Sequence, residues 1–292
     1  VEALHLAEVD KPVPGPGELL VRVAAAGVNP ADGKWRQGMF KSFIPIALPH
    51  VPGYDIAGTV EAVGEDVAGW REGDRVAGLL GNTTHGGYAE FAAAEAQACA
   101  RVPESLDLAV AAALPVAGLT GVQMIEEQIK PAHGETVLVT GAAGAVGRFI
   151  VQAALARGAR VVAAVRPAQA DEARALGASE AIALGQDASG MTFDHVADTV
   201  GGPAVARLCR QLRPGGRICT AATDPIDPEG LAAEPVFIFL HQDGARLQRI
   251  VDEIAAGALP VPIARRMPLA RAAEAQLLTA AGGLGGKIIL EP

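Results

Sequence analysis

The chain has 292 residues, 50% of them hydrophobic and 20% charged, which is enough to bury sizeable cores and predicts two domains. Its net charge of −9 and its lack of any lysine and arginine cluster argue against nucleic acid or an anionic membrane as the main partner. The three cysteines lie far apart without a C-x-x-C pair, which favours a reducing, cytoplasmic location, and no apolar run reaches membrane-spanning length. Whether a targeting segment precedes Val1 stays open.

Short apolar runs separated by glycine and proline fill the first hundred residues. They predict strands at 19–27, 55–64, 74–80, 87–94 and 98–103. Regular short strands of this kind are typical of a β-barrel. Helices are expected at 106–113 and 119–129, with a linker between domains near Pro115.

The segment 135–158 predicts a strand, a glycine turn and a helix. Residues 136–140 are uniformly apolar and β-branched, as in a strand that is covered on both faces. The turn GAAGAVG follows, and apolar residues then recur with helical spacing until Gly158. Backbone N–H groups at such a helix N-terminus can approach a pyrophosphate without interference from a Cβ atom.

The turn matches the dinucleotide fingerprint G-x-G-x-x-G with Ala142 at its first position. A second strand at 160–165 completes a βαβ unit of the expected length, which strengthens this weak match. At the end of that strand, where NAD-binding chains carry an acidic residue, this chain has Arg166. An arginine there favours a ribose 2′-phosphate, so the sequence predicts NADP(H); the alternative is that Arg166 is simply a solvated residue.

Strands and helices continue to alternate after the βαβ unit, which predicts a doubly wound parallel sheet. Strands are expected at 180–184, 195–200, 217–222 and 236–240, with an amphipathic helix ending at Gly257. Pro260-Val261-Pro262 then indicates a return to the first domain, completed by a helix at 269–281 and a strand at 287–290.

Several motifs, in this order, resemble the medium-chain dehydrogenase/reductase superfamily, and within it the zinc-free quinone oxidoreductase (zeta-crystallin-like) and enone reductase branch. They are GVNPADGKWRQG at 27–38, VPGYDIAGTVEAVG at 51–64, WREGDRV at 70–76, GGYAEF at 86–91, VTGAAGAVG at 139–147, LRPGGR at 212–217 and GGKIILEP at 285–292. The resemblance implies a GroES-like β-barrel catalytic domain at 1–116 and 262–292. It also implies an inserted Rossmann NADP(H)-binding domain at 117–261, with the nicotinamide held in a cleft between the two.

The residues at the expected zinc positions argue against a metal. Where zinc-dependent relatives carry cysteine and Gly-His-Glu, this chain has Asn29 and Gly53-Tyr54-Asp55, and the four-cysteine structural lobe is absent. No metal ligand is therefore assigned. Without zinc, reduction of a quinone or of an activated C=C bond is favoured over interconversion of a ketone and an alcohol.

Three residues of the first domain are candidates for catalysis. Lys34 resembles the lysine of enone reductases and could stabilise an enolate oxygen or donate a proton; alternatively it is exposed or contacts only the cofactor ribose. Asn29 resembles the family's asparagine near the nicotinamide, with a turn residue as the alternative. Tyr54 could direct its hydroxyl into the cleft, or be packed in a loop.

The resemblance also implies the neighbours of the cofactor and the assembly. The expected cofactor-binding residues are Thr120, Gly144, Ala145, Val146, Arg166, Thr199 and Phe239. The chain has a glycine-rich run at 282–286 where relatives often place an arginine, which leaves a second phosphate contact in doubt. A homodimer acting on a small-molecule quinone or enone is expected. The competing hypothesis is a non-catalytic NADPH-binding protein with a structural or regulatory, crystallin-like role.

Overall fold

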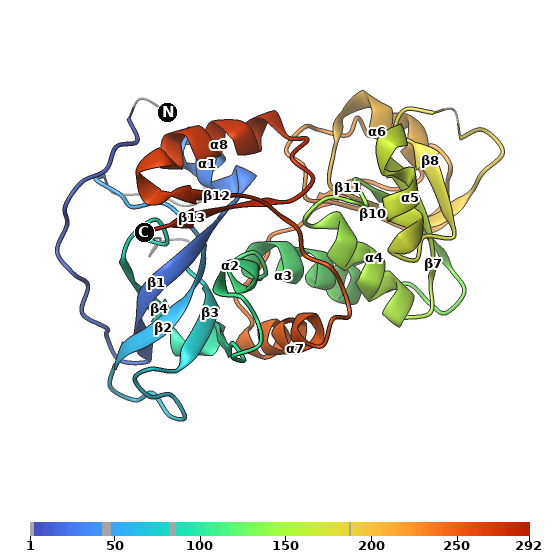
Figure 1. The fold of residues 1–292 in the computed structure, drawn as a ribbon. Helices are drawn as coiled ribbons and strands as arrows, with labels where there is room; N and C mark the ends of the chain where they lie inside the picture. The colour runs from blue at the N-terminus through green and yellow to red at the C-terminus, as the bar shows by residue number, and fades with distance from the viewer. Residues whose placement is uncertain (1–2, 43–47, 82–85, 187) are drawn as a thin grey trace. The chain divides into compact units, whose positions relative to one another are not determined.

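The computed structural model of the protein describes residues 3–42, 48–81, 86–186 and 188–292 (Figure 1). The chain forms two compact units: unit 1 is Val1–Leu119 with His241–Pro292, and unit 2 is Thr120–Leu240. The chain passes from unit 1 into unit 2 inside helix α3 (Pro115–Gln123), so Pro115 begins a helix where the sequence predicted a linker. In the described ranges, no helix is both long and apolar enough to cross a bilayer.

Unit 1 is built on one sheet, most of whose strand pairs are antiparallel. Its strands are β1 (Glu18–Val28), β2 (Asp55–Val63), β3 (Arg75–Leu79), β4 (Phe91–Glu95), β5 (Cys99–Arg101), β12 (Ile263–Pro268) and β13 (Lys287–Glu291). Its helical segments are α1 (Pro30–Arg36), η1 (Ala96–Ala98), α2 (Leu108–Ala111), α7 (Gly244–Ala255), η4 (Leu269–Arg271) and α8 (Ala272–Ala281). The strand order is β12-β13-β1-β2-β3-β5, with β4 also paired to β1.

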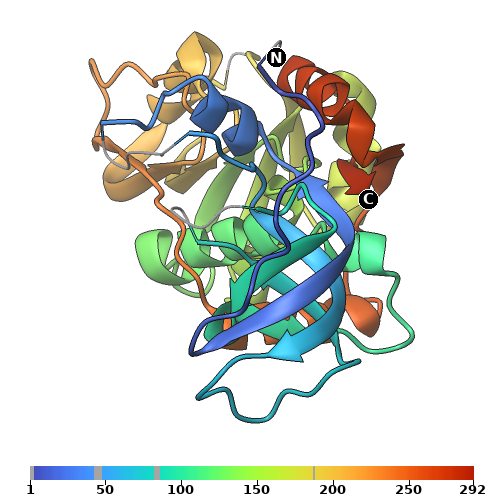
Figure 2. The same cartoon turned by 90° about the vertical axis from the view of Figure 1, so that its left-hand side faces the viewer.

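The long strand β1 allows this sheet to close as a barrel. One edge of β1 pairs with β2, while its other edge pairs first with β4 and then with β13. Because β4 leads through the short turn η1 into β5, and β5 pairs with β3, the ring of strands is complete. Leu19, Val21 and Val23, which alternate along β1, contribute to one buried core. Figure 2 shows the blue β1 and its neighbours curving around one another, as the predicted barrel requires.

Unit 2 contains a parallel sheet with helices packed against its strands. Its strands are β6 (Thr136–Thr140), β7 (Arg160–Val165), β8 (Glu180–Ala183), β9 (Phe193–Asp198), β10 (Leu212–Thr220) and β11 (Pro235–Phe237). Its helical segments, after the last turn of α3, are η2 (Met124–Ile129), α4 (Gly147–Ala156), η3 (Pro167–Gln169), α5 (Ala170–Ala175) and α6 (Gly202–Cys209). Helix α4 packs on β6 and β7, α5 on β7 and β8, and α6 on β10 (Figure 1).

The order of the strands in unit 2 confirms the predicted doubly wound sheet. The order is β11-β10-β9-β6-β7-β8, and each pair of neighbouring strands is parallel. The chain winds outward from β6 to β8 and then crosses back to β9 on the other side of β6. The switch point of the sheet therefore lies between the carboxyl ends of β6 and β9, which is where open α/β sheets bind ligands.

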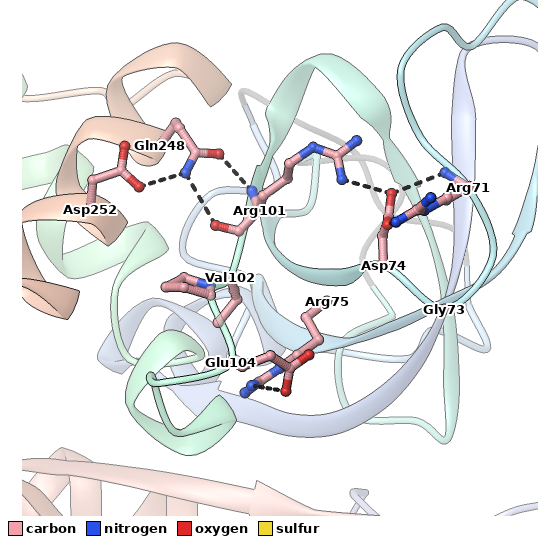
Figure 3. Close-up of a pocket in the computed structure, with 10 residues that line it drawn as sticks. Arg71, Gly73, Asp74, Arg75, Arg101, Val102, Glu104, Gln248 and Asp252 are labelled. Atoms are coloured by element: carbon pink, nitrogen blue, oxygen red, sulfur yellow. Dashed lines mark hydrogen bonds and ion pairs between the residues drawn. The ribbon is translucent and has the colours of Figure 1, made fainter.

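Helix α7 packs with unit 1, whereas the sequence analysis placed it in the inserted domain and ended that domain at residue 261. A Cβ atom on Gly244 would lie 2.3 Å from the carbonyl oxygen of Gln97, so the start of α7 lies directly against unit 1. The Gln248 side chain accepts the N–H of Arg101 at 2.7 Å and donates to the Arg101 carbonyl at 3.1 Å (Figure 3). The apolar stripe of an amphipathic helix predicts that it packs on a core, but not on which core.

Candidate functional site

The turn between β6 and α4 is shaped by two glycines. Gly141 has a φ of 64°, and a Cβ atom there would lie 2.3 Å from the hydroxyl oxygen of Thr199. A Cβ atom on Gly147 would lie 2.1 Å from the carbonyl oxygen of Gly141, so α4 packs closely on the end of the strand. The tight-turn glycine is therefore Gly141 rather than the position of Ala142, and the operative pattern is G-x-x-G-x-x-G.

The three residues of this turn that were predicted to bind the cofactor are all accessible to solvent, and Gly141 is partly exposed beside them. Gly144 is exposed and Ala145 and Val146 are partly exposed, immediately before the first residue of α4. An accessible turn at a helix N-terminus, with a glycine at its tip, fits the pyrophosphate of a dinucleotide. Thr199 is held nearby, because its hydroxyl donates to the Thr140 carbonyl at 2.9 Å.

Arg166 lies directly after β7, at the position that the sequence analysis predicted to contact a ribose 2′-phosphate. It follows the last residue of β7, is exposed, and donates from Nε to the Gln169 side chain at 3.0 Å. The next acidic residue, Asp171, is paired with Arg174 at 2.9 Å. The guanidinium of Arg166 is thus accessible to an anion, and β7 is not followed directly by a carboxylate.

The other two residues predicted to contact the cofactor lie at the two ends of unit 2. Thr120 is buried on α3. Phe239 lies beyond β11, which ends at Phe237 and not at residue 240 as predicted, and 69% of it is exposed. Its ring centroid lies 5.1 Å from that of Phe237. Contact of Thr120 and Phe239 with a cofactor stays a prediction.

In unit 1, a buried polar network forms around Asn29. Its side-chain nitrogen donates to Asp55 Oδ2 at 2.9 Å, and its side-chain oxygen accepts from Lys287 Nζ at 2.5 Å. Lys287 Nζ is also 3.1 Å from Asp55 Oδ2, and Asp55 Oδ1 accepts the backbone N–H of Val116 at 2.8 Å. The network thereby joins the start of α1, β2, β13 and the N-terminus of α3, all within unit 1.

Asp32, three residues after Asn29, is a second buried acid. Its Oδ2 accepts the Asn29 backbone N–H at 2.8 Å and the Tyr88 hydroxyl at 2.7 Å, whereas its Oδ1 has no hydrogen-bond partner among the residues described. Burial raises the pKa of the Asp32 carboxyl to about 7, and the nearby Asp55 carboxylate adds to this effect. The same burial, with the charge of Asp32, holds the pKa of Tyr88 well above its ordinary value.

Lys34 and Tyr54 lie in different environments. Lys34 is half-buried on α1, and this desolvation lowers the pKa of its ammonium below the ordinary value. Tyr54 immediately precedes β2 and is buried, and burial followed by the charge of Asp32 raises the pKa of its hydroxyl. Tyr54 is therefore a hydroxyl donor at neutral pH, and Lys34 is a cation that loses its proton more readily than a free lysine.

The sequence analysis predicted no role for four buried or sterically fixed residues. Lys287 and Asp55 belong to the Asn29 network, Gly141 shapes the turn, and Asp198 accepts the hydroxyl of Thr140 beside that turn. The G-x-x-G-x-x-G spacing would have identified Gly141. Asp198 ends an apolar strand, and this position at a carboxyl edge was the available signal. The pairing of Lys287 with Asp55 spans residues 232 positions apart and has no local signal.

A surface groove of about 390 Å³ on unit 1 is lined by three arginines (Figure 3). Arg71 and Arg101 both pair with Asp74, at 3.2 and 2.7 Å, and Arg75 pairs with Glu104 at 3.0 Å. These two acids offset two of the three arginine charges, and a third acid, Asp252, also lines the groove. The groove therefore has the composition of a solvated ion-pair surface, and we assign it no role.

Comparison with known proteins agrees with this architecture. Residues 15–104 match the model of the alcohol dehydrogenase GroES-like domain, and residues 169–290 match that of the zinc-binding dehydrogenase family. A chloroplastic quinone oxidoreductase of Triphysaria versicolor is 30% identical over 307 residues, covering 98% of this chain and 93% of that protein. A 2-methylene-furan-3-one reductase of Solanum lycopersicum is 31% identical over 288 residues, covering 94% and 72%.

Solved structures resemble the chain over nearly its whole length. The quinone oxidoreductase of Coxiella burnetii has a TM-score of 0.87 at 27% identity, covering 100% of this chain and 95% of the other. An NAD-dependent alcohol dehydrogenase gives 0.89 at 28% identity, covering 100% and 96%. A mycobacterial protein complexed with NADPH gives 0.81 at 30% identity, covering 98% and 94%.

A barrel unit joined to a doubly wound parallel sheet, in a chain with these relatives, defines an oxidoreductase of small molecules. The chain belongs to the medium-chain dehydrogenase/reductase superfamily, where its relatives include quinone oxidoreductases and an enone reductase. The resemblance seen in the motifs is thereby confirmed.

The residues at the expected zinc position do not fit the metal that the name of the second family model implies. Zinc is normally held by cysteine, histidine or carboxylate ligands, whereas Asn29 and Tyr54 offer an amide and a hydroxyl. The one carboxylate, Asp55, is already paired with the Lys287 ammonium at 3.1 Å. Among the described residues, no group of three or more His, Cys, Asp or Glu is arranged to hold a metal ion.

Proposed function

We propose that the protein is an NADPH-dependent oxidoreductase that reduces quinones, or the C=C bond of α,β-unsaturated carbonyl compounds, without zinc. The buried contact of Lys287 with Asn29 and Asp55 is the observation that carries the zinc-free part of this proposal. The ammonium is held by Asn29 and Asp55, two residues at the positions where zinc ligands would be expected, and it is paired with the carboxylate of Asp55. Polarisation of the substrate must then come from side chains.

Arg166 and the accessible turn at Gly144 support NADPH as the cofactor. An exposed guanidinium directly after β7 provides a planar set of donors for a 2′-phosphate, which NADH lacks. The mycobacterial relative that binds NADPH supports this choice, and the NAD-dependent relative is the reason for testing it. When bound, a reduced nicotinamide supplies the hydride.

The side chains of unit 1 would act on the carbonyl end of the substrate. Addition of hydride to the β-carbon breaks the C=C π bond, places negative charge on the carbonyl oxygen and leaves an enolate that needs a proton at the α-carbon. The Lys34 ammonium would stabilise that oxygen or supply the proton, and its lowered pKa makes the transfer easier. Tyr54 would add a hydroxyl donor. Asn29 would position the start of α1, because its amide is already engaged by Asp55 and Lys287.

The test is oxidation of NADPH and, separately, of NADH by the purified protein, followed at the nicotinamide absorbance. The acceptors are a quinone, an enone, a short 2-alkenal and a simple ketone, and the same protein is assayed for bound zinc. Turnover of NADPH with the quinone or the enones but not with the ketone, without stoichiometric zinc, supports the proposal. Stoichiometric zinc with ketone reduction contradicts it. Tight NADPH binding without any turnover supports the non-catalytic alternative.

We also propose a homodimer in the cytoplasm. The dimer follows from the family resemblance, and light scattering at twice the 29.7 kDa chain mass is the expected result; a monomer would contradict it. The location follows from three dispersed cysteines, all buried as free thiols, whereas the name of the Triphysaria relative places that protein in the chloroplast.

A further inference from the structure

Asp198 is a fully buried carboxylate at the carboxyl end of β9, beside the switch point of the sheet. Its Oδ1 accepts the Thr140 hydroxyl at 2.5 Å and the backbone N–H of Val200 at 2.9 Å. Its Oδ2 accepts the Thr220 hydroxyl at 2.5 Å, and the N–H of Gly201 reaches both oxygens, at 3.0 and 3.1 Å. The side chain therefore joins the ends of β6, β9 and β10.

The direction of these hydrogen bonds indicates that Asp198 is ionised. The Thr140 oxygen accepts the N–H of Thr199 at 3.1 Å, and the Thr220 oxygen accepts the N–H of Ala222 at 2.9 Å, which orients each hydroxyl proton toward the carboxylate. The other two groups are backbone N–H donors. A carboxyl group whose partners all donate is acting as an acceptor at both oxygens, which is the behaviour of the charged form.

The negative charge of Asp198 has no cationic partner among the residues that the structure describes. Its hydrogen bonds come from neutral hydroxyl and amide groups, which solvate the charge without cancelling it. A buried charge is screened much less than a charge in water, so its field extends to the surface of the sheet directly above it.

The fold places this charge under one particular half of a dinucleotide. In a doubly wound sheet the two mononucleotides lie on the two sides of the switch point. On the proposed function, Arg166 after β7 takes the adenosine ribose on the β6-β7-β8 side. The nicotinamide mononucleotide would then bind on the β9-β10-β11 side. Asp198 is buried on that side, at the carboxyl end of β9.

We propose that Asp198 tunes the cofactor equilibrium, favouring the oxidised nicotinamide, which is a cation, over the neutral reduced ring. The inference rests on the proposed function, since it requires a nicotinamide cofactor. The pyrophosphate and the 2′-phosphate are common to both forms, so their repulsion by Asp198 cancels in a comparison of the two. What is left is the attraction between the carboxylate and the positive ring, which helps the reduced cofactor to give up its hydride.

The test compares the Kd values for NADP+ and NADPH, measured by titration calorimetry, in the wild-type protein and in Asp198→Asn. The amide keeps the shape of the side chain but removes the charge. We expect the Kd for NADP+ to rise by about tenfold more than the Kd for NADPH. This is the order of effect expected when one charge acts on another nearby charge through a partly screened medium. A ratio that changes by less than about twofold would overturn the proposal.

Thr220→Val is the matched control, because it removes one hydroxyl donor and leaves the charge in place. We expect it to weaken both forms of the cofactor to a similar extent. A change in the ratio as large as that of Asp198→Asn would mean that the geometry of the network, and not its charge, sets the ratio, and this too would overturn the proposal.

Two further results keep this test separate from the proposed function. If the wild-type protein binds neither NADP(H) nor NAD(H), the proposed function itself fails; if it binds NAD(H), the same ratio is measured with NAD+ and NADH. If Asp198→Asn does not fold, as judged by circular dichroism, Val200→Lys adds a cation at the residue whose backbone N–H donates to the carboxylate, with Val200→Gln as its neutral control. A selective loss of NADP+ affinity in the lysine variant supports the proposal, and equal ratios in the two variants overturn it.

Discussion

Asn29 is fixed by hydrogen bonds to Asp55 and Lys287, whereas Lys34, further along the same short helix, is half-buried. Both residues were predicted to be catalytic, and the structure gives them different physical settings. An amide with both of its polar atoms engaged is suited to holding a backbone in place. An ammonium at the border of solvent is suited to meeting a ligand.

Lys34→Ala should lower kcat and kcat/KM together by about a hundredfold, because it removes a donor needed mainly when charge develops on the substrate oxygen. Since only the protonated lysine can donate, and burial lowers its pKa, wild-type kcat/KM should fall as pH rises through a pKa below the ordinary lysine value of 10.5. Lys34→Arg should move that decline to higher pH. Steady-state kinetics across the alkaline range, with the exposed Lys41→Ala as control, provide the measurement; unchanged turnover in Lys34→Ala would contradict the role.

Arg166→Asp should raise the Kd for NADPH by about tenfold to a hundredfold and change that for NADH much less. The reason is that the lost charge-assisted hydrogen bonds reach only a 2′-phosphate. Calorimetric titration with both cofactors measures the difference. Arg174→Asp is the matched control, since Arg174 is exposed on α5 and already paired with Asp171. Equal losses of affinity for NADPH and NADH would show that Arg166 does not bind the 2′-phosphate.

Asp32 should make folding stability depend on pH. Its folded pKa of about 7 lies above the ordinary 3.8, so the native state holds a proton that the unfolded chain releases. The free energy of unfolding should therefore fall as pH rises from about 4 to 7, by at most about 4 kcal/mol from this group. Urea unfolding of the wild type and of Asp32→Asn at pH 5 and pH 8 tests this, because the variant should lack the decline. Parallel pH dependence in the two proteins would contradict it.

Among the helices and strands, Lys287 joins parts of the chain that no local sequence pattern connects. Its ammonium links β13 to the start of α1 and to β2, while Asp55 of β2 also binds the N-terminus of α3. Elements from both ends of the sequence therefore meet at one buried ion pair. The arrangement of α1, which carries Lys34, depends on that pair.

Lys287→Met should destabilise the protein by about 3–5 kcal/mol, because Asp55 is then left as a buried charge without its partner. Thermal and urea unfolding measure the loss. Lys11→Met is the matched control: Lys11 pairs with Glu61 at the surface, where such pairs contribute at most about 1 kcal/mol. Similar small effects of the two substitutions would show that the buried pair is not a structural support.

At the scale of the whole molecule, the two compact units have separate buried cores. The turn at Gly144 and Arg166 both belong to unit 2, and the Lys287 network belongs to unit 1. A ligand of one unit and a mutation in the other should therefore act on different parts of the unfolding transition.

Saturating NADPH, at about a hundred times its Kd, should stabilise unit 2 by about 2.7 kcal/mol, while Lys287→Met should lower the stability of unit 1. Differential scanning calorimetry of the wild type and the variant, each with and without NADPH, resolves the two effects. We expect NADPH to shift the higher-temperature part of the transition in Lys287→Met without restoring the lower part. A single transition that NADPH shifts as a whole would show that the units unfold together.

Local sequence patterns were sufficient to predict several elements. The strand at 136–140, the glycine turn, the strand at 160–165 and Arg166 follow from period, β-branching and turn chemistry within about thirty consecutive residues, a span over which such signals are strong. The family motifs added the barrel and the return of the chain. The family resemblance also singled out Asn29 and Lys34, but it did not predict the helix α1 that carries Lys34.

Contacts between distant residues could not be predicted from local patterns and became visible only in the folded chain. Lys287 meets Asp55 across 232 positions, Asp198 gathers hydroxyls from β6 and β10, and α7 packs on unit 1, because each contact depends on strand order and on which of two cores accepts an apolar face. Hydrophobic burial is not directional, so a pattern says that a face is buried but not against what. Buried charges likewise carry no local sequence signature. Burial makes an unpaired charge costly, and the partner that offsets this cost comes close only when the chain folds.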